Sequence, residues 1–141
     1  MRSSGTRSPS RDPRQHLGAA GEEAAERLLE RAGLRVLARR FRCRAGEIDL
    51  VALDGAVVVF VEVKTRRRLS HGRPAASVTA KKRDHMARAA GFFVATLGTE
   101  APRCRFDVVE VFSAAGGELT LHHIRDAFRL GLWGDCGPSQ Q

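Results

Sequence analysis

The sequence predicts an α/β fold, a three-layer sandwich in which a central mixed sheet of about five strands is flanked by helices. Three observations lead to this class. Two segments carry apolar residues at helical spacing, and five shorter apolar runs have the length and β-branched content of strands. Their order along the chain is helix, three strands, helix, two strands, which favours helices packed on a sheet.

The first half of the chain contains one helix and three strands. Residues 17–32 place Ala, Gly and Leu on one stripe, and Gly33 follows as a helix stop. Residues 34–41 and 46–53 have the composition of strands. Residues 56–64 are apolar almost to their end, which is typical of a central strand covered on both faces.

The second half begins with a polar segment at residues 65–77, for which we expect a loop. A second helix is predicted over residues 78–97, where apolar side chains recur in helical register. Two further strands are predicted at 104–112 and 118–124, with Gly116-Gly117 at the turn between them.

We expect a single domain over residues 16–132, since 141 residues is a usual size for one domain. Residues 1–15 are Ser, Arg and Pro with little that is apolar, which predicts a disordered basic tail. Residues 133–141 are expected to form a loose C-terminal tail.

The composition narrows the function classes. A net charge of +8 favours a polyanionic partner such as DNA, although a general solubility charge would look the same. The three cysteines show no C-x-x-C pairing, and no apolar stretch reaches the roughly 18 residues of a membrane span. We therefore expect a cytoplasmic protein with no membrane segment. Nucleotide-binding glycine motifs and a G-x-S-x-G elbow are absent from the sequence.

A hairpin in the first half gathers acidic residues. Asp54-Gly55 between two apolar runs predicts a two-residue loop. With that loop, Leu53 pairs with Ala56, and Asp49 lies opposite Phe60. Alternation then predicts two faces, one with Glu47, Asp49, Phe60, Glu62 and Lys64, and the other with Ile48, Leu50, Val61 and Val63.

Asp49 and Glu62 would be diagonal neighbours at roughly 7–8 Å, close enough for both to reach one ion. Buried like charges require a compensating cation, and both Lys64 and a divalent metal are candidates. Oxygen ligands select a hard ion such as Mg²⁺ or Mn²⁺. The alternative is a plain structural salt bridge between Glu62 and Lys64 or a nearby arginine.

Two residues on the helices are further candidates. Glu22 lies at the edge of the first helix's apolar stripe and could point toward the sheet, or could be a solvated acid favoured by the helix dipole. Lys82 shares the apolar face of the second helix, which favours a phosphate contact or, alternatively, a lysine that extends its ammonium to solvent.

A basic segment starts where the acidic residues end. It contains Arg66, Arg67, Arg68 and Arg73. Arginines around an acidic metal site would suit a phosphodiester substrate, since they hold the backbone while the acids hold the metal. The alternative is a run of solvated arginines.

Five ordered motifs carry a family resemblance. The sequence is similar to the YraN-like family of small bacterial proteins over about residues 17–130. The motifs are G-A-A-G-E-E-x-A (18–25), F-R-C-R-A-G-E-I-D-L-V-A (41–52), V-F-V-E-V-K-T-R (59–66), R-F-D-V (105–108) and I-R-D-A-F (124–128).

That family resembles the restriction-endonuclease-like PD-(D/E)XK superfamily, especially the archaeal Holliday-junction resolvases. The resemblance implies a restriction-endonuclease-like sandwich with Asp49, Glu62 and Lys64 as the nuclease signature. It also implies Mg²⁺ on Asp49, Glu62 and the Val63 carbonyl, with Glu22 matching the first-helix acid. The superfamily's Pro-Asp is Ile48-Asp49 here. A homodimer is a further implication, since junction-cutting relatives are dimers.

The leading hypothesis is a Mg²⁺- or Mn²⁺-dependent endonuclease acting on DNA, including branched or damaged DNA. The first alternative is a nucleic-acid-binding module on a nuclease scaffold without turnover, and the other alternative is a protein-interaction adaptor. Cleavage separates the leading hypothesis from both alternatives, and salt-dependent DNA binding separates the binding module from the adaptor.

Overall fold

The computed structural model describes residues 13–67, 78–98 and 102–129. Within these residues the elements follow the predicted order of helix, three strands, helix, two strands. They are α1 (Pro13–Arg31), β1 (Arg35–Cys43), β2 (Gly46–Asp54), β3 (Val57–Arg67), α2 (Ala80–Thr96), β4 (Arg103–Ser113) and β5 (Leu119–Phe128). Neither helix of this described part is long and apolar enough to cross a membrane.

The element boundaries differ from the predicted ones mainly at the ends. Helix α1 begins at Pro13, four residues before its predicted start and within the predicted tail of residues 1–15. Strand β3 continues to Arg67, beyond the predicted end of its apolar run. Residues 133–141 and most of the segment 65–77 lie outside the described residues.

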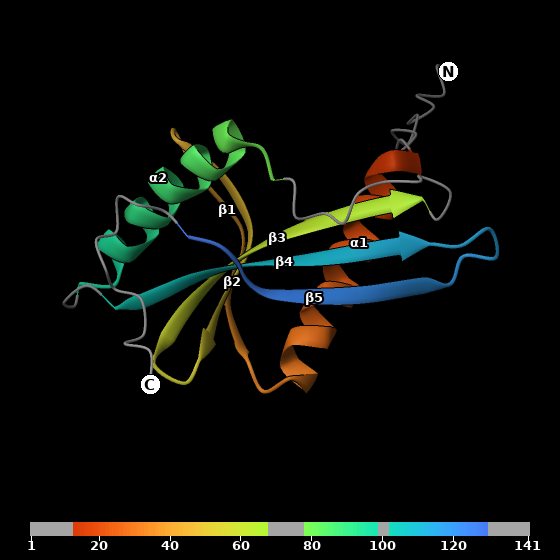
Figure 1. Cartoon of the computed structure of the whole chain (residues 1–141), viewed down its shortest axis with the longest axis horizontal. Helices are drawn as coiled ribbons and strands as arrows, with labels where there is room; N and C mark the ends of the chain where they lie inside the picture. The colour runs from red at the N-terminus through yellow and green to blue at the C-terminus, as the bar shows by residue number, and fades with distance from the viewer. Residues whose placement is uncertain (1–12, 68–77, 99–101, 130–141) are drawn as a thin grey trace, which may run out of the picture.

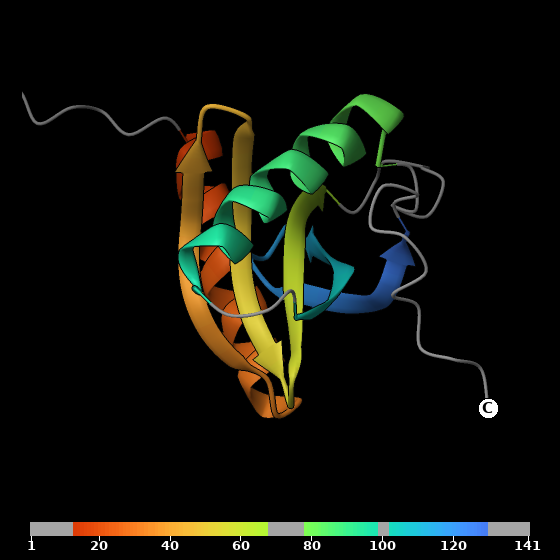
Figure 2. The same cartoon turned by 90° about the vertical axis from the view of Figure 1, so that its left-hand side faces the viewer.

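The five strands form one mixed sheet in the order β1-β2-β3-β4-β5. The β3–β4 pair is parallel and the other three pairs are antiparallel. The parallel pair requires a crossover, and α2 provides it. The predicted α/β class with a mixed sheet between helices is confirmed, and Figures 1 and 2 show α1 and α2 on opposite faces of the sheet.

Each helix packs on its own apolar cluster. On one face, Ala25 and Leu29 of α1 pack against apolar side chains that include Leu50, Val61 and Val109. On the other face, the buried residues of α2 pack against a second set of strand residues, namely Ile48, Val51, Val58, Phe60, Phe106 and Val108. A central strand such as β3 is therefore buried on both faces, as its apolar sequence predicts.

The β2–β3 hairpin exists, but its loop is shifted by one residue. Asp54 pairs with Val57, so the loop is Gly55-Ala56 and the predicted pairing of Leu53 with Ala56 is wrong. Gly55 has φ +59° and takes the first loop position, and a positive φ at this position of a two-residue loop favours Gly. Each residue of β2 therefore faces a residue two positions further along β3 than predicted. Asp49 lies at the level of Glu62 rather than of Phe60.

The alternation of faces breaks at Asp49. Ile48 and Val51 both pack in the α2-side cluster, whereas Leu50 packs in the α1-side cluster. The prediction that Ile48 shares a face with Leu50 is therefore wrong. The paired residues of β2 and β3 end at Leu50 and Val61, and beyond that point the Val63 N–H donates to Asp49 Oδ2 at 2.8 Å. A side chain has thus replaced a backbone acceptor in the sheet.

Gly21 fixes the distance between α1 and the sheet. A Cβ at this position would lie 2.5 Å from Thr65 Oγ1 on β3, far inside van der Waals contact. Because the next residue is Glu22, the close approach at Gly21 also determines how near that carboxylate lies to the strands.

We predict that Gly21→Ala destabilises the protein by about 1–3 kcal/mol, because the added methyl group overpacks the interface between α1 and β3. Urea denaturation measures the change. In the background of Thr65→Ala the cost should largely disappear, since the clashing hydroxyl is gone.

Gly18→Ala is the matched control for the same helix. No atom outside the helix lies within 4 Å of a Cβ built at Gly18. This substitution should leave stability unchanged or raise it by up to about 1 kcal/mol, through helix propensity alone. Equal stability of Gly21→Ala and wild type would contradict the role of Gly21 in packing.

Candidate metal and phosphodiester site

The centre of the site is the carboxylate pair of Asp49 and Glu62. Asp49 comes from β2 at the break in the sheet, and Glu62 comes from β3 on the face that α2 covers. The two side chains lie close enough that each carboxyl affects the pKa of the other. Glu62 is only 8% exposed. The two acids therefore lie close enough to affect each other's ionisation, in a register two residues from the predicted one.

Burial and mutual repulsion change the acidity of both groups. Burial raises the pKa of Glu62, and the Asp49 charge raises it further, to about 7. Burial also raises the pKa of Asp49, although the hydrogen bond from the Val63 N–H opposes the rise. Without a further cation, the pair therefore holds a proton more tightly than ordinary carboxylates do.

The positive charge of Lys82 only partly compensates the two carboxylates. Lys82 Nζ lies 3.5 Å from Glu62 Oε1, and the Lys82 side chain is 40% exposed. Lys82 belongs to the first turn of α2, where Thr79 caps the helix by accepting a hydrogen bond from the Lys82 N–H at 3.2 Å. Glu62 Oε2 is buried and makes no hydrogen bond with any described group.

Lys64 lies two residues after Glu62 on the regular part of β3, so the two side chains share the α2-side face. In the parallel pairing of β3 and β4, Lys64 stands beside Glu110, a carboxylate that is 3% exposed. The next strand continues the row with His122, whose Nδ1 lies 4.0 Å from Glu110 Oε1. Sequence reasoning missed Glu110, although an acid between the apolar residues Val109 and Val111 of β4 was a signal for it.

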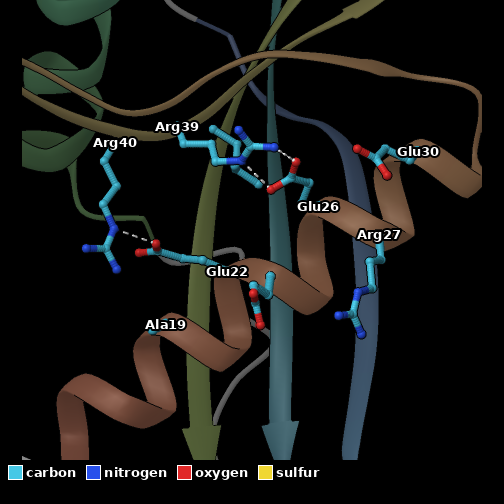
Figure 3. A pocket seen from close by; sticks show the side chains of 9 residues that line it. Ala19, Glu22, Glu26, Arg27, Glu30, Arg39 and Arg40 are labelled. Atoms are coloured by element: carbon cyan, nitrogen blue, oxygen red, sulfur yellow. Dashed lines mark hydrogen bonds and ion pairs between the residues drawn. The ribbon is translucent and has the colours of Figure 1, made fainter.

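Glu22 reaches the site from the α1 face. Its Oε2 accepts a hydrogen bond of 2.8 Å from Arg40 Nε, and its charge raises the pKa of Asp49. Figure 3 shows this pair beside a second one, in which Arg39 donates to Glu26, within a hollow between α1 and β1. Leu50 lines the same hollow. Sequence reasoning did not single out Arg40.

The remaining predicted residues have different outcomes. Glu47 pairs with Arg42 at 3.4 Å and its side chain is 39% exposed, so it is not part of the buried pair. Arg66 lies half-buried on β3. The side chain of Arg67 and the whole of Arg68 and Arg73 lie outside the described residues, so their predicted DNA contacts stay predictions.

A second group of buried charges offers a comparison. Asp107 on β4 is fully buried, and its oxygens accept hydrogen bonds from Arg105 Nε at 3.0 Å and the Asp126 N–H at 2.9 Å, with His123 Nε2 at 2.8 Å. Burial alone would raise the pKa of Asp107, but the hydrogen bonds from His123 and Arg105 outweigh it and hold the pKa below its usual value. This carboxylate is compensated, and its role is structural.

The Asp49–Glu62 pair fits a divalent cation because it lacks such compensation. Glu62 has a buried oxygen without a hydrogen-bond partner, and repulsion from Asp49 favours its protonated form. A hard divalent ion would bind that oxygen and displace the proton. Among the described residues, no three acidic, His or Cys side chains gather closely enough to bind one ion. Asp49 and Glu62 could hold an ion only with further oxygen ligands, for which the family resemblance implies the Val63 carbonyl, with water completing the shell.

Comparisons with known proteins agree with the resemblance of the sequence at the level of the family. The family described as "Uncharacterised protein family UPF0102", to which YraN-like proteins belong, matches residues 21–111. A UPF0102 protein of Symbiobacterium thermophilum is 51% identical over 114 residues, covering 81% of this chain and 97% of that protein.

Two further relatives show the same coverage. A UPF0102 protein of Xylella fastidiosa is 52% identical over 119 residues, which cover 83% of this chain and 95% of the relative. One from Caldicellulosiruptor saccharolyticus is 42% identical over 116 residues, which cover 82% and 98%. The similarity thus extends over nearly the whole length of each relative.

The raised pKa of Glu62 predicts a pH-dependent stability in the absence of divalent ions. Between the ordinary value of 4.5 and about 7, the folded state keeps a proton that the unfolded state has lost. Stability should therefore fall as the pH rises through this window, and level off above it. Glu62→Gln should remove most of this slope, and at pH 8 should be more stable than wild type by on the order of 2 kcal/mol.

Urea denaturation from pH 4 to 9 in the presence of a chelator measures this effect. Glu47→Gln serves as the control, because Glu47 is an exposed acid on the neighbouring strand. It should retain the wild-type slope. Parallel stability curves for wild type and Glu62→Gln would show that Glu62 titrates normally.

Proposed function

The chain belongs to the uncharacterised protein family UPF0102, and we propose that it is a Mg²⁺- or Mn²⁺-dependent nuclease that hydrolyses phosphodiester bonds in DNA. One observation carries the proposal. The half-buried Asp49 and the buried Glu62 form a carboxylate pair, and one oxygen of Glu62 makes no hydrogen bond with any described group. Such a pair is costly in a protein that does not bind a cation.

The chemistry of the donors selects the ion. Two carboxylates and the Val63 carbonyl would provide an all-oxygen site, which suits Mg²⁺ or Mn²⁺ rather than zinc. Such an ion supplies Lewis acidity, since it polarises a phosphodiester and lowers the pKa of a water molecule. Asp49 is held in place by the Val63 N–H, so one ligand is positioned before the ion arrives.

The lysines of the site act on negative charge. Lys64 extends from the same face as Glu62, and its ammonium would stabilise the charge that develops on the phosphate oxygens. Lys82 approaches Glu62 from the N-terminal turn of α2, where the helix dipole also favours an anion. A phosphate group between them would meet two cationic side chains.

The charge of the chain supports a nucleic-acid substrate. The net charge is +8, and Arg66 and Arg67 end β3, after Lys64 and Thr65. With Arg68 and Arg73, they would hold the phosphate backbone without reading the bases. The sequence motifs G-E-I-D and E-V-K resemble the PD-(D/E)XK nuclease signature, and the mixed sheet flanked by helices is consistent with that superfamily.

We predict that purified protein with Mn²⁺ cleaves at least one substrate among branched, single-stranded and duplex DNA. Asp49→Ala and Lys64→Ala should each lower the cleavage rate by at least about a hundredfold, because they remove an ion ligand and an electrostatic partner. Gel analysis of end-labelled DNA measures the rates.

Glu47→Ala is the matched control, since it removes an acid of β2 that lies outside the buried pair. It should cleave at a rate close to that of wild type. If no substrate is cleaved but salt-dependent DNA binding survives Asp49→Ala, the protein is a non-catalytic DNA-binding module and the nuclease proposal fails.

A further inference from the structure

Strand β1 is irregular at Arg40, opposite the break in β2. The residues on either side of Arg40, Arg39 and Phe41, pair with Leu50 and Ile48, which places Arg40 opposite Asp49. Arg40 has φ +48°, a left-handed conformation that side-chain-bearing residues rarely adopt. Strain of this kind persists only where the surrounding structure imposes it, and it is often found at functional sites.

The strained backbone redirects the Arg40 side chain. Successive side chains of a regular strand point to opposite faces, yet Arg39 and Arg40 both reach acids of α1 (Figure 3). Ala38 and Phe41, three residues apart, both pack on the α2-side cluster. The left-handed residue therefore places two consecutive arginines on the α1 side of the sheet.

On the α1 side of the sheet, Arg40 is the arginine on which the acids of the site act. Its Nε donates to Glu22 at 2.8 Å, and the charges of Glu47 and Asp49 also act on its guanidinium. The Arg40 side chain is 51% exposed, so a large anion can reach it. Glu22, in turn, is close enough to Asp49 for their charges to repel.

We propose that Arg40 is a phosphate-binding residue that Glu22 holds in the free protein and releases to DNA when a divalent cation draws Glu22 toward Asp49. This inference rests on the proposed function, since it requires the cation and the DNA. Arg40 neutralises Glu22 before the ion binds. Once the ion neutralises Glu22 instead, the Arg40 guanidinium can pair with a phosphate in the bidentate geometry that arginine favours.

The exchange predicts opposite effects on two ligands. In Arg40→Gly, which accepts φ +48° without strain, Glu22 has no competing partner. Mg²⁺ affinity should rise about threefold to fivefold, the equivalent of one exposed ion pair. DNA affinity at saturating Mg²⁺ should fall about tenfold, and the salt dependence of binding should lose about one phosphate contact. A residue with only a structural role would weaken both.

The measurements are Mg²⁺ titration by calorimetry and fluorescence anisotropy with labelled duplex DNA. All proteins carry Lys64→Ala, which leaves both carboxylates in place and prevents turnover during the binding assay. Arg39→Ala is the matched control. Arg39 pairs with Glu26 in the same hollow but lies opposite Leu50 rather than Asp49. It should leave Mg²⁺ affinity unchanged, and DNA affinity within about twofold.

Glu22→Gln provides an independent variant. It should release Arg40 without a cation, so DNA affinity in chelator should rise while Mg²⁺ affinity falls. If Arg40→Gly weakens both ligands, or lowers DNA affinity equally with and without Mg²⁺, the exchange is wrong although the nuclease proposal stands. If the Lys64→Ala protein binds no Mg²⁺, both proposals fail.

Discussion

The structure depends on two carboxylates that lie side by side within a sheet. The Asp49 side chain accepts a hydrogen bond from the Val63 N–H, and the backbone pairing of β2 and β3 ends at Leu50 and Val61. The face alternation of β2 breaks there, and Arg40 opposite adopts a left-handed conformation. These irregularities cost conformational energy, and together they bring Asp49 beside Glu62, with Glu22 and its partner Arg40 on the α1 side.

The two buried acid centres of this fold show what distinguishes a site from a structural network. Asp107 has guanidinium, imidazole and backbone partners, and its pKa is lowered despite its burial. Lys82 Nζ lies 3.5 Å from Glu62 Oε1 on a side chain that is 40% exposed, and the pKa of Glu62 is raised to about 7. Networks that are fully satisfied stabilise a fold, whereas a buried carboxylate without enough partners takes up a proton or a cation. The electrostatics therefore favour the Asp49–Glu62 pair over Asp107 as the place for the proposed ion.

Periodicity and turn residues predicted the order of the elements, the mixed sheet and the proximity of Asp49 to Glu62. They did so because the apolar runs are long and the hairpin signal at Gly55 is strong. The register was missed because two-residue hairpin loops accept Gly at either loop position, and the sequence does not distinguish the two cases. The role of Arg40 was missed for another reason. Nothing in an arginine's identity marks a left-handed backbone, and its partner Glu22 lies 18 residues away.

The central claim is that the Asp49–Glu62 pair binds a divalent cation, and calorimetric titration of Mn²⁺ into the wild-type protein and Asp49→Ala tests it most directly. At pH 7, we expect one ion per wild-type chain. We also expect proton release that appears as a buffer-dependent heat, since the pKa of Glu62 is about 7. Asp49→Ala should bind no ion at the same concentrations. An absence of binding to wild type, or equal binding to both proteins, would contradict the claim.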